Sequence, residues 1–191
     1  VQKIVEEEIG QRISKAFACF DVQPLASASI GQVHLAILRS GKKVAVKIQR
    51  PGVRKNFTED LDTLKELTDV AVKHSKTAKK YAVDEILDEL RFILLNELDY
   101  VKEAENLIAL GENTKKYPKI VIPQPVEGYS TSKILTMDYI DGQKITSISP
   151  ISRIETNYKP LVDELVAAYL KHIIFDGFAH ADHHPGNVHL T

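Results

Sequence analysis

The spacing of apolar residues along the chain predicts a mixed α+β protein. Apolar and β-branched residues fill positions 35–38 and 43–49, and the short linker between them contains Gly41, so we expect a β-hairpin there. Residues 1–20 before the hairpin are predicted to form an N-terminal helical extension. Further short strands are predicted near 120–122 and 133–137.

Three later segments have helical periodicity, with apolar residues three or four positions apart. The first segment carries Leu61, Leu64, Leu67 and Ala71. The second carries Ile86, Leu87, Leu90, Ile93, Leu94 and Leu98. The chain after Gly142 is predicted to be helical, with an apolar face formed by Leu161, Leu165, Tyr169, Ile173 and Ile174.

Composition narrows the class of protein. The chain has 191 residues, of which 43% are hydrophobic, enough for one substantial core or a two-lobed domain. Its net charge is -1, which gives no electrostatic reason to expect nucleic-acid binding. The single cysteine, Cys19, excludes an internal disulfide and suits a reducing compartment. No stretch approaches the roughly 18 consecutive apolar residues of a membrane helix, and the start lacks a signal-peptide pattern.

The end of the chain contains a candidate catalytic loop. His180, Asp182 and Asn187 reproduce the H-x-D-x-x-x-x-N spacing of phosphotransferases. In such loops the aspartate positions the attacking hydroxyl or water, and the asparagine helps to hold Mg²⁺ against the phosphates. The spacing matters because one short loop must place both oxygens.

A second motif lies upstream. Residues 44–48 form an apolar strand with a single lysine, Lys47, as in the kinase strand whose lysine contacts the α and β phosphates. The preceding segment aligns with the phosphate-covering G-x-G-x-x-G-x-V loop, but alanines replace its first two glycines. Because alanine resists positive φ, we expect a stiffer loop, with altered nucleotide geometry or selectivity. The residues expected to contact nucleotide here are Ala26, Ser27, Ala28, Ser29, Ile30, Gly31 and Val33.

Taken together these motifs resemble one family. The alanine-rich stretch 24–34, the strand 44–50, the segment 97–100 and the loop 180–187 look like the UbiB family, also called ABC1 or ADCK atypical kinases. The resemblance implies a two-lobed protein-kinase-like fold, with an antiparallel sheet and extra helices in the N-lobe (21–140). It implies a partial helical C-lobe (141–191) that is truncated after the catalytic loop.

The resemblance also implies the roles of individual residues. Lys47 would bind the phosphates of ATP and pair with Glu103, which takes the place of the kinase helix αC glutamate. Glu97 and Asp99 match the family's E-x-D element and would lie near the phosphates. Two carboxylates two positions apart cannot share one face of a regular helix, so we expect them near a helix irregularity or pointing to different partners.

Further roles concern the base and the metal. By resemblance Met137 would be the gatekeeper of the nucleotide pocket, and the backbone of Asp138 and Ile140 would bind the adenine. Asp182 would be the catalytic residue, and Asn187 would hold Mg²⁺. If the protein ends at Thr191, it lacks the D-F-G aspartate, and we expect weaker nucleotide binding and almost no phosphoryl transfer.

The implied function is that of an ATP-dependent kinase or ATPase supporting isoprenoid quinone (ubiquinone-type) biosynthesis. Its partners would be an adenine nucleotide and quinone-like lipids or quinone-biosynthesis proteins, with no nucleic acid. Membrane contact would come only through segments outside this chain. The expected location is the cytoplasm or a membrane periphery on the reducing side, which is the mitochondrial matrix side in a eukaryote.

Other interpretations stay open from the sequence. The loop at 180–187 also looks like that of aminoglycoside or choline phosphotransferases, and a non-enzymatic nucleotide-binding scaffold is a third function class. Lys47 could be an edge-strand lysine, and the acidic set at 97–103 a solvated helix face. The residues His180, Asp182, His183, His184 and His189 could instead bind a transition metal.

Overall fold

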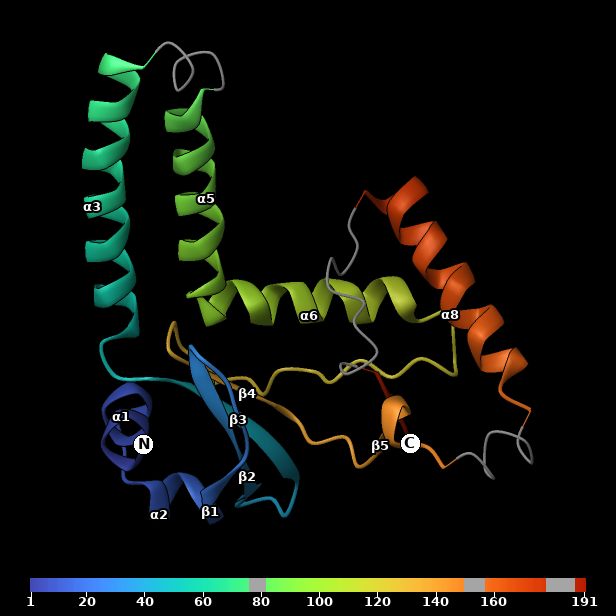
Figure 1. Cartoon of the computed structure of the whole chain (residues 1–191). Helices are drawn as coiled ribbons and strands as arrows, with labels where there is room; N and C mark the ends of the chain where they lie inside the picture. Colours follow the sequence, from blue (N-terminus) through green and yellow to red (C-terminus); the bar gives the residue numbers. More distant parts are fainter. Residues whose placement is uncertain (76–81, 150–156, 178–187) are drawn as a thin grey trace. The chain divides into compact units, whose positions relative to one another are not determined.

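The computed structural model describes residues 1–75, 82–149, 157–177 and 188–191 (Figure 1). The chain divides into two compact units. The first comprises residues 1–104 and 126–137, and the second comprises residues 105–125 and 138–191. The lobes expected from the sequence, 21–140 and 141–191, stay a prediction.

A four-stranded sheet lies at the centre of the first unit, with strand order β1-β2-β3-β4. Strands β1 and β2 pair antiparallel, as do β2 and β3. The predicted hairpin is confirmed, with β2 starting earlier than expected. The strand bounds are β1 (Phe17–Ser27), β2 (Gly31–Leu38), β3 (Lys43–Gln49) and β4 (Ile134–Asp138).

The predicted strand at 120–122 is wrong. The backbone N–H of Ile120 donates to the carbonyl of Tyr117 in a turn, at 3.0 Å. Pro123 and Pro125 follow directly and have no N–H group to donate to a ladder. The residues of the other predicted strand, 133–137, are found mostly in β4.

The expected single helix over residues 1–20 is also wrong. Two short helices, α1 (Gln2–Ile9) and α2 (Ile13–Ala16), are separated at Gly10, whose φ of 72° ends α1 in the left-handed conformation. Strand β1 then begins at Phe17, which is buried with the sheet. Burial of the apolar Phe17 side chain in the sheet core therefore outweighs continuation of the helix beyond Ala16.

The hydrophobic core joins these helices to one face of the sheet. Alternate residues of β3 point into it, and each of Val44, Val46 and Ile48 is fully buried. Phe17 packs against the rings of Phe20 and Tyr129, with centroid distances of 5.5 and 5.6 Å. The remaining buried members of this core are Val5, Ala16, Ala36, Leu38 and Ile134.

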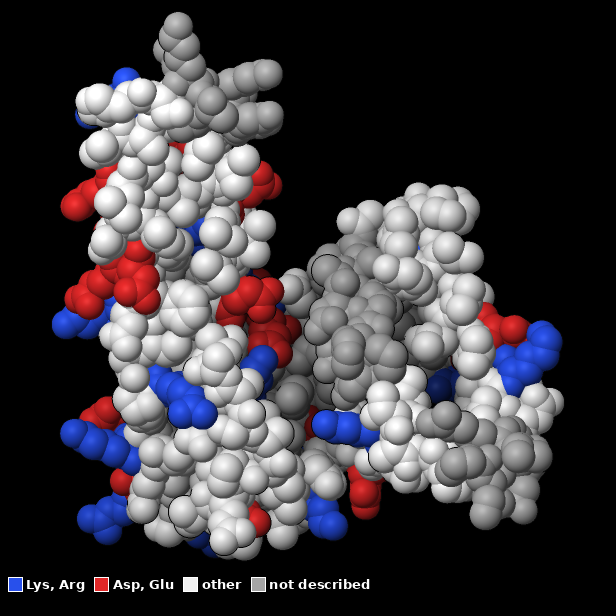
Figure 2. All heavy atoms as spheres, in the orientation of Figure 1, with Lys and Arg blue, Asp and Glu red and all other residues white. Residues whose placement is uncertain are grey.

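Three helices follow β3: α3 (Val53–His74), α5 (Val83–Glu97) and α6 (Tyr100–Thr114). The two long helices predicted from periodicity are confirmed as α3 and α5, which lie side by side in Figure 1. Ion pairs cross between them, from Lys65 to Asp88 and from Arg91 to Asp62. Figure 2 shows acidic and basic side chains interspersed over this hairpin.

The second unit contains the helix predicted near the end of the chain, α8 (Lys159–Lys171), with Pro160 in its first turn. Not all of the described chain after Gly142 is helical, however, because the two-residue strands β5 (Gln143–Lys144) and β6 (His189–Leu190) pair with each other. Short helical turns are η1 (Ile145–Ser147) and η2 (His172–Asp176). Within the described ranges, no helix combines the length and apolar character needed to cross a bilayer.

An ion pair connects α1 to the residues that lead into β4. The carboxylate of Glu8 accepts hydrogen bonds from Lys133 Nζ at 2.6 Å and from Thr131 Oγ1 at 2.8 Å. The hydrogen bond from Lys133 lowers the pKa of Glu8 below its ordinary value of 4.5, with a smaller contribution from Thr131. The charged form of Glu8 therefore stabilises the fold.

We predict that Glu8→Gln lowers the free energy of unfolding at pH 7 by about 0.5–1 kcal/mol, a modest value because the Lys133 side chain is half-exposed. A depressed carboxyl pKa contributes stability that is present above pH 4.5 and is lost as the pH falls through the folded value. Urea titrations at several pH values should therefore show the two proteins converging below pH 4.5. A difference that persists unchanged at low pH would contradict this role of Glu8.

Candidate functional site

Lys47 stands near the middle of the central strand β3. Strand alternation places it on the opposite face from Val46 and Ile48, which point into the core. On β2, Val33 lies directly opposite Lys47 in the antiparallel register. The strand thus fixes the lysine backbone firmly while its side chain reaches out of the core.

The ammonium group of Lys47 meets the carboxylate of Glu103, from the first turn of α6. Nζ lies 2.8 Å from Oε1 and 2.7 Å from Oε2. The two side chains are 26% and 36% exposed, so the pair contributes only about 0–1 kcal/mol to stability. Its main consequence is positional, because it holds an ammonium group at a defined and accessible point.

Tyr100 lies beneath the lysine. Its ring centroid is 4.7 Å from Lys47 Nζ, within range of a cation–π interaction. The residue is fully buried, and its hydroxyl has no hydrogen-bond partner among the described residues. Burial raises the pKa of Tyr100 far above its ordinary value, with a smaller contribution from the charge of Glu103, so the phenol stays neutral.

A break between α5 and α6 places Glu103. Helix α5 ends at Glu97, and Leu98 is buried. Asp99 then starts α6, since its Oδ1 accepts the backbone N–H of Val101 at 3.1 Å, which is a helix N-cap contact. Of the two arrangements expected for Glu97 and Asp99, the structure shows the helix irregularity. Glu97 is exposed, whereas Asp99 has a structural role as the cap.

Gln49 fastens this junction to the sheet. Its side chain is buried, and Nε2 donates to the carbonyls of Leu98 at 2.7 Å and Ser132 at 3.1 Å. The same Ser132 carbonyl accepts the backbone N–H of Tyr100 at 3.1 Å. These hydrogen bonds connect the end of β3, the helix junction and the residues before β4. They fix where α6 begins and hence where Glu103 lies.

The alanine-rich segment forms two strand ends and a tight turn. Ala26 pairs with Val33 and Ser27 with Gln32. The N–H of Ala28 donates to the carbonyl of Gly31 at 2.8 Å. Ala82 alone among the described non-glycine residues has a positive φ, so the alanines that replace glycines here adopt an ordinary backbone conformation.

Gly31 is required at the base of this turn by close packing. A Cβ atom there would lie 2.7 Å from the Tyr100 hydroxyl and 2.8 Å from the carbonyl oxygen of Ile48. Both distances are shorter than real Cβ contacts. The backbone of β2 therefore approaches both β3 and the buried tyrosine too closely for any side chain.

The other predicted site residues are placed as follows. Met137 and Asp138 are the last two residues of β4. Met137 belongs to the first unit, whereas Asp138 and Ile140 belong to the second. The candidate catalytic residues Asp182 and Asn187 lie outside the described residues, as does most of the alternative histidine cluster. Among the described residues, no group of three or more ligating side chains could hold a metal.

Sequence reasoning missed Gln49, Tyr100 and Arg50. A signal for Gln49 was available, since it lies two residues after Lys47 on the same face of an otherwise apolar strand. Tyr100 directly follows the E-x-D element but belongs to no sequence motif that would assign it a role. Arg50 follows the strand and is exposed, so only three-dimensional contacts reveal its partners.

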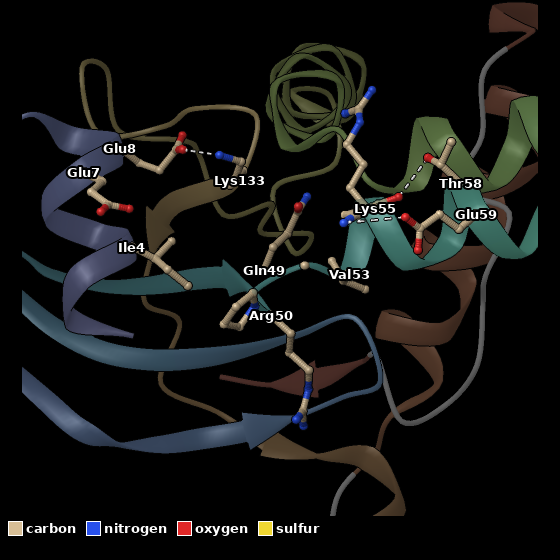
Figure 3. A pocket seen from close by; sticks show the side chains of 13 residues that line it. Ile4, Glu7, Glu8, Gln49, Arg50, Val53, Lys55, Thr58, Glu59 and Lys133 are labelled. Carbon is tan, nitrogen blue, oxygen red and sulfur yellow. Dashed lines mark hydrogen bonds and ion pairs between the residues drawn. The ribbon is translucent and has the colours of Figure 1, made fainter.

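A separate pocket of about 700 Å³ opens on the first unit, between α1 and the start of α3 (Figure 3). Its lining does not include Lys47, Glu103 or Tyr100, so we do not assign it to the predicted nucleotide site. Its charged side chains include the ion pairs Glu8–Lys133 and Lys55–Glu59. Arg50 also lines it, at the end of β3.

We predict that Gly31→Ala lowers the free energy of unfolding by about 1–3 kcal/mol, because the backbone of Ile48 cannot move away from the added methyl group. Tyr100→Phe alone should be neutral within about 0.5 kcal/mol or stabilising, since it removes a buried hydroxyl without a partner among the described residues. The double variant Gly31→Ala/Tyr100→Phe should recover only part of the unfolding free energy lost in Gly31→Ala, because the clash with the Ile48 carbonyl remains. Urea unfolding measures all three, and an unaltered Gly31→Ala protein would contradict the packing described.

Comparison with known proteins identifies the family. Residues 1–191 match the ABC1 atypical kinase-like domain. A "Probable protein kinase UbiB" of Pseudomonas fluorescens is 35% identical over 99% of this chain and 35% of its own length. The Arabidopsis thaliana protein "ACTIVITY OF BC1 COMPLEX KINASE 8, chloroplastic" is 39% identical over 97% of this chain and 24% of its own length.

The fold has a similar solved counterpart in Mycobacterium tuberculosis Rv3197, whose structure was determined in complex with erythromycin. It matches with a TM-score of 0.75 and 33% identity, over 98% of this chain and 46% of that one. The chain spans about a third of the length of the first curated relatives that it matches. The sequence motifs, the Lys47–Glu103 pair and these matches together show that the chain belongs to the ABC1 (UbiB) family of atypical kinase-like proteins.

Proposed function

We propose that this domain binds ATP as an atypical kinase or ATPase of the UbiB type. The observation that carries the proposal is the two-oxygen contact between Lys47 and Glu103 on the open side of β3. An ammonium group has three N–H donors and no acceptor. A lysine held in this way can still turn a donor toward phosphate oxygens.

The surroundings of the lysine support a phosphate site. Lys47 lies opposite Val33, close to the turn that the alanine-rich segment makes at 28–31. The turn supplies backbone groups and carries no acidic side chain that would repel a phosphate. We assign the covering of the phosphates to Ala26–Gly31, with Val33 against the sugar or base.

The remaining roles extend this proposal to the rest of the nucleotide. Met137 would border the adenine, and the backbones of Asp138 and Ile140 would bind its edge. Asn187 would hold Mg²⁺, which neutralises phosphate charge when bound, and Asp182 would orient the attacking water or hydroxyl. Glu97 would lie near the phosphates, while Asp99 would act there in addition to capping α6.

We further propose that the ATP cycle supports isoprenoid quinone biosynthesis, acting on quinone-like lipids or on the enzymes that modify them. The support for this role comes from the sequence resemblance to the UbiB family. The expected location is the cytoplasm or a membrane periphery on the reducing side. Contact with membrane would involve segments outside this chain.

We predict that Lys47→Ala weakens ATP and ADP binding by about tenfold to a hundredfold, because a charge-assisted hydrogen bond contributes about 1.5–3 kcal/mol. Isothermal titration calorimetry with and without Mg²⁺ measures the dissociation constants. The matched control is Lys43→Ala, which removes the same charge from the exposed start of the same strand. Glu103→Gln should weaken binding less, since it leaves the ammonium group in place.

Equal affinities for the wild type, Lys47→Ala and Lys43→Ala proteins would contradict the assignment of the site. The physiological role has a separate test in phosphate release from ATP. Stimulation by quinone-like phenols supports the quinone proposal, whereas turnover that depends on a soluble alcohol acceptor would replace it with a small-molecule kinase. Nucleotide binding without any turnover would favour a nucleotide-binding scaffold.

A further inference from the structure

The tip of the β1–β2 hairpin has little support from burial or from regular strand pairing. The segment of β1 from Asp21 to Ser27 is exposed, and so are Ala28 and Ser29. The pairing of β1 with β2 is irregular here, with register shifts between Phe20 and Pro24 and again before Ala26. Strand pairing alone therefore holds the turn at 28–31 weakly.

Arg50 supplies additional support from the neighbouring strand. Its backbone N–H donates to the carbonyl of Ile30 at 3.0 Å. Its side chain donates from Nε to the carbonyl of Ala28 at 3.0 Å and from Nη2 to Ser27 Oγ at 2.9 Å. One residue thus contacts three parts of the hairpin tip. Figure 3 shows this side chain directed away from the pocket between α1 and α3.

The backbone of Arg50 is itself well placed to act as an anchor. It directly follows β3, and its carbonyl accepts the N–H of Val53 at 3.3 Å. Pro51 restricts the chain, and Gly52 turns it with a φ of 73° into α3. The guanidinium group therefore extends from a fixed backbone toward a hairpin tip with little other support.

We propose that Arg50 is a positioning residue for nucleotide binding, holding the alanine-rich turn in the conformation that covers the phosphates. The planar guanidinium fork suits this task because two donors of fixed relative direction meet Ala28 and Ser27 together. Arg50 acts on the nucleotide through the turn, since these donors are already occupied. This inference rests on the proposed nucleotide site and adds a residue to it.

A lysine substitution separates geometry from charge. The Arg50→Lys protein keeps the positive charge, but an ammonium group cannot present two donors in a fixed plane. If Arg50 acted only by attracting phosphate, Arg50→Lys would behave like the wild type while Arg50→Met would not. If Arg50 acts by fixing the turn, both Arg50→Lys and Arg50→Met should release the turn.

The experiment combines hydrogen exchange without nucleotide and calorimetric titration with ADP and Mg²⁺-ATP, on the whole chain. The variants are Arg50→Met, Arg50→Lys and Ser27→Ala. Arg54→Met is the matched control, because it removes the same charge four residues later and no hydrogen bond described at the turn involves Arg54. We expect amide exchange over residues 26–32 to rise roughly tenfold in both Arg50 variants and less in Ser27→Ala.

In the same Arg50 variants, nucleotide affinity should fall by roughly threefold to tenfold, while Arg54→Met resembles the wild type. Unchanged exchange at the turn in both Arg50 variants would overturn the anchoring role, whatever the affinity. Faster exchange with unchanged affinity would overturn its link to the nucleotide. A wild type that binds no nucleotide would instead refute the proposed function itself, and the exchange data would still report on the turn.

Discussion

The geometry of the proposed site depends on the ion pair between Lys47 and Glu103. It joins the central strand to the first turn of α6, across 56 residues of sequence. Being partly exposed, it contributes too little stability to hold two such distant elements together by itself. The hydrogen bonds of the buried Gln49 side chain do that instead, since they fix the junction of α5 and α6. The exposed cap contact of Asp99 sets the residue at which α6 starts. A change of one residue in the helix start would rotate Glu103 by about 100° around α6 and away from the lysine.

The alanine-rich segment illustrates how this fold accommodates alanine where the G-x-G-x-x-G-x-V loop of protein kinases has glycine. Alanine disfavours positive φ, and the turn at 28–31 avoids that region. The one glycine that remains, Gly31, is needed for a different reason, which is the close approach of the Tyr100 hydroxyl and the Ile48 carbonyl. The segment is thus confined at its base by packing and at its tip by Arg50.

The sequence predicted the elements that have strong periodicity and the pairs that belong to a motif. The hairpin around Gly41 and the helices α3 and α5 were predicted because their apolar spacing spans many residues. The N-terminal helix was overextended, because Phe17 has no local signal that distinguishes a place in a helix from a place in the sheet. The strand expected at 120–122 failed because Pro123 and Pro125 outweigh a short apolar run. The contacts of Tyr100 and Arg50 depend on residues far away in sequence, so no local pattern could reveal them, whereas Gln49 had a signal in its place on the same strand face as Lys47.

The central claim is that Lys47 lies against the phosphates of a bound nucleotide. An acyl-phosphate derivative of ATP transfers its acyl group to a lysine that lies beside the phosphates, and mass spectrometry of the digested protein identifies that lysine. We expect Lys47 to be labelled preferentially and unmodified ATP with Mg²⁺ to suppress the labelling. Labelling spread evenly over surface lysines such as Lys43, or labelling of Lys47 that excess ATP leaves unchanged, would contradict it.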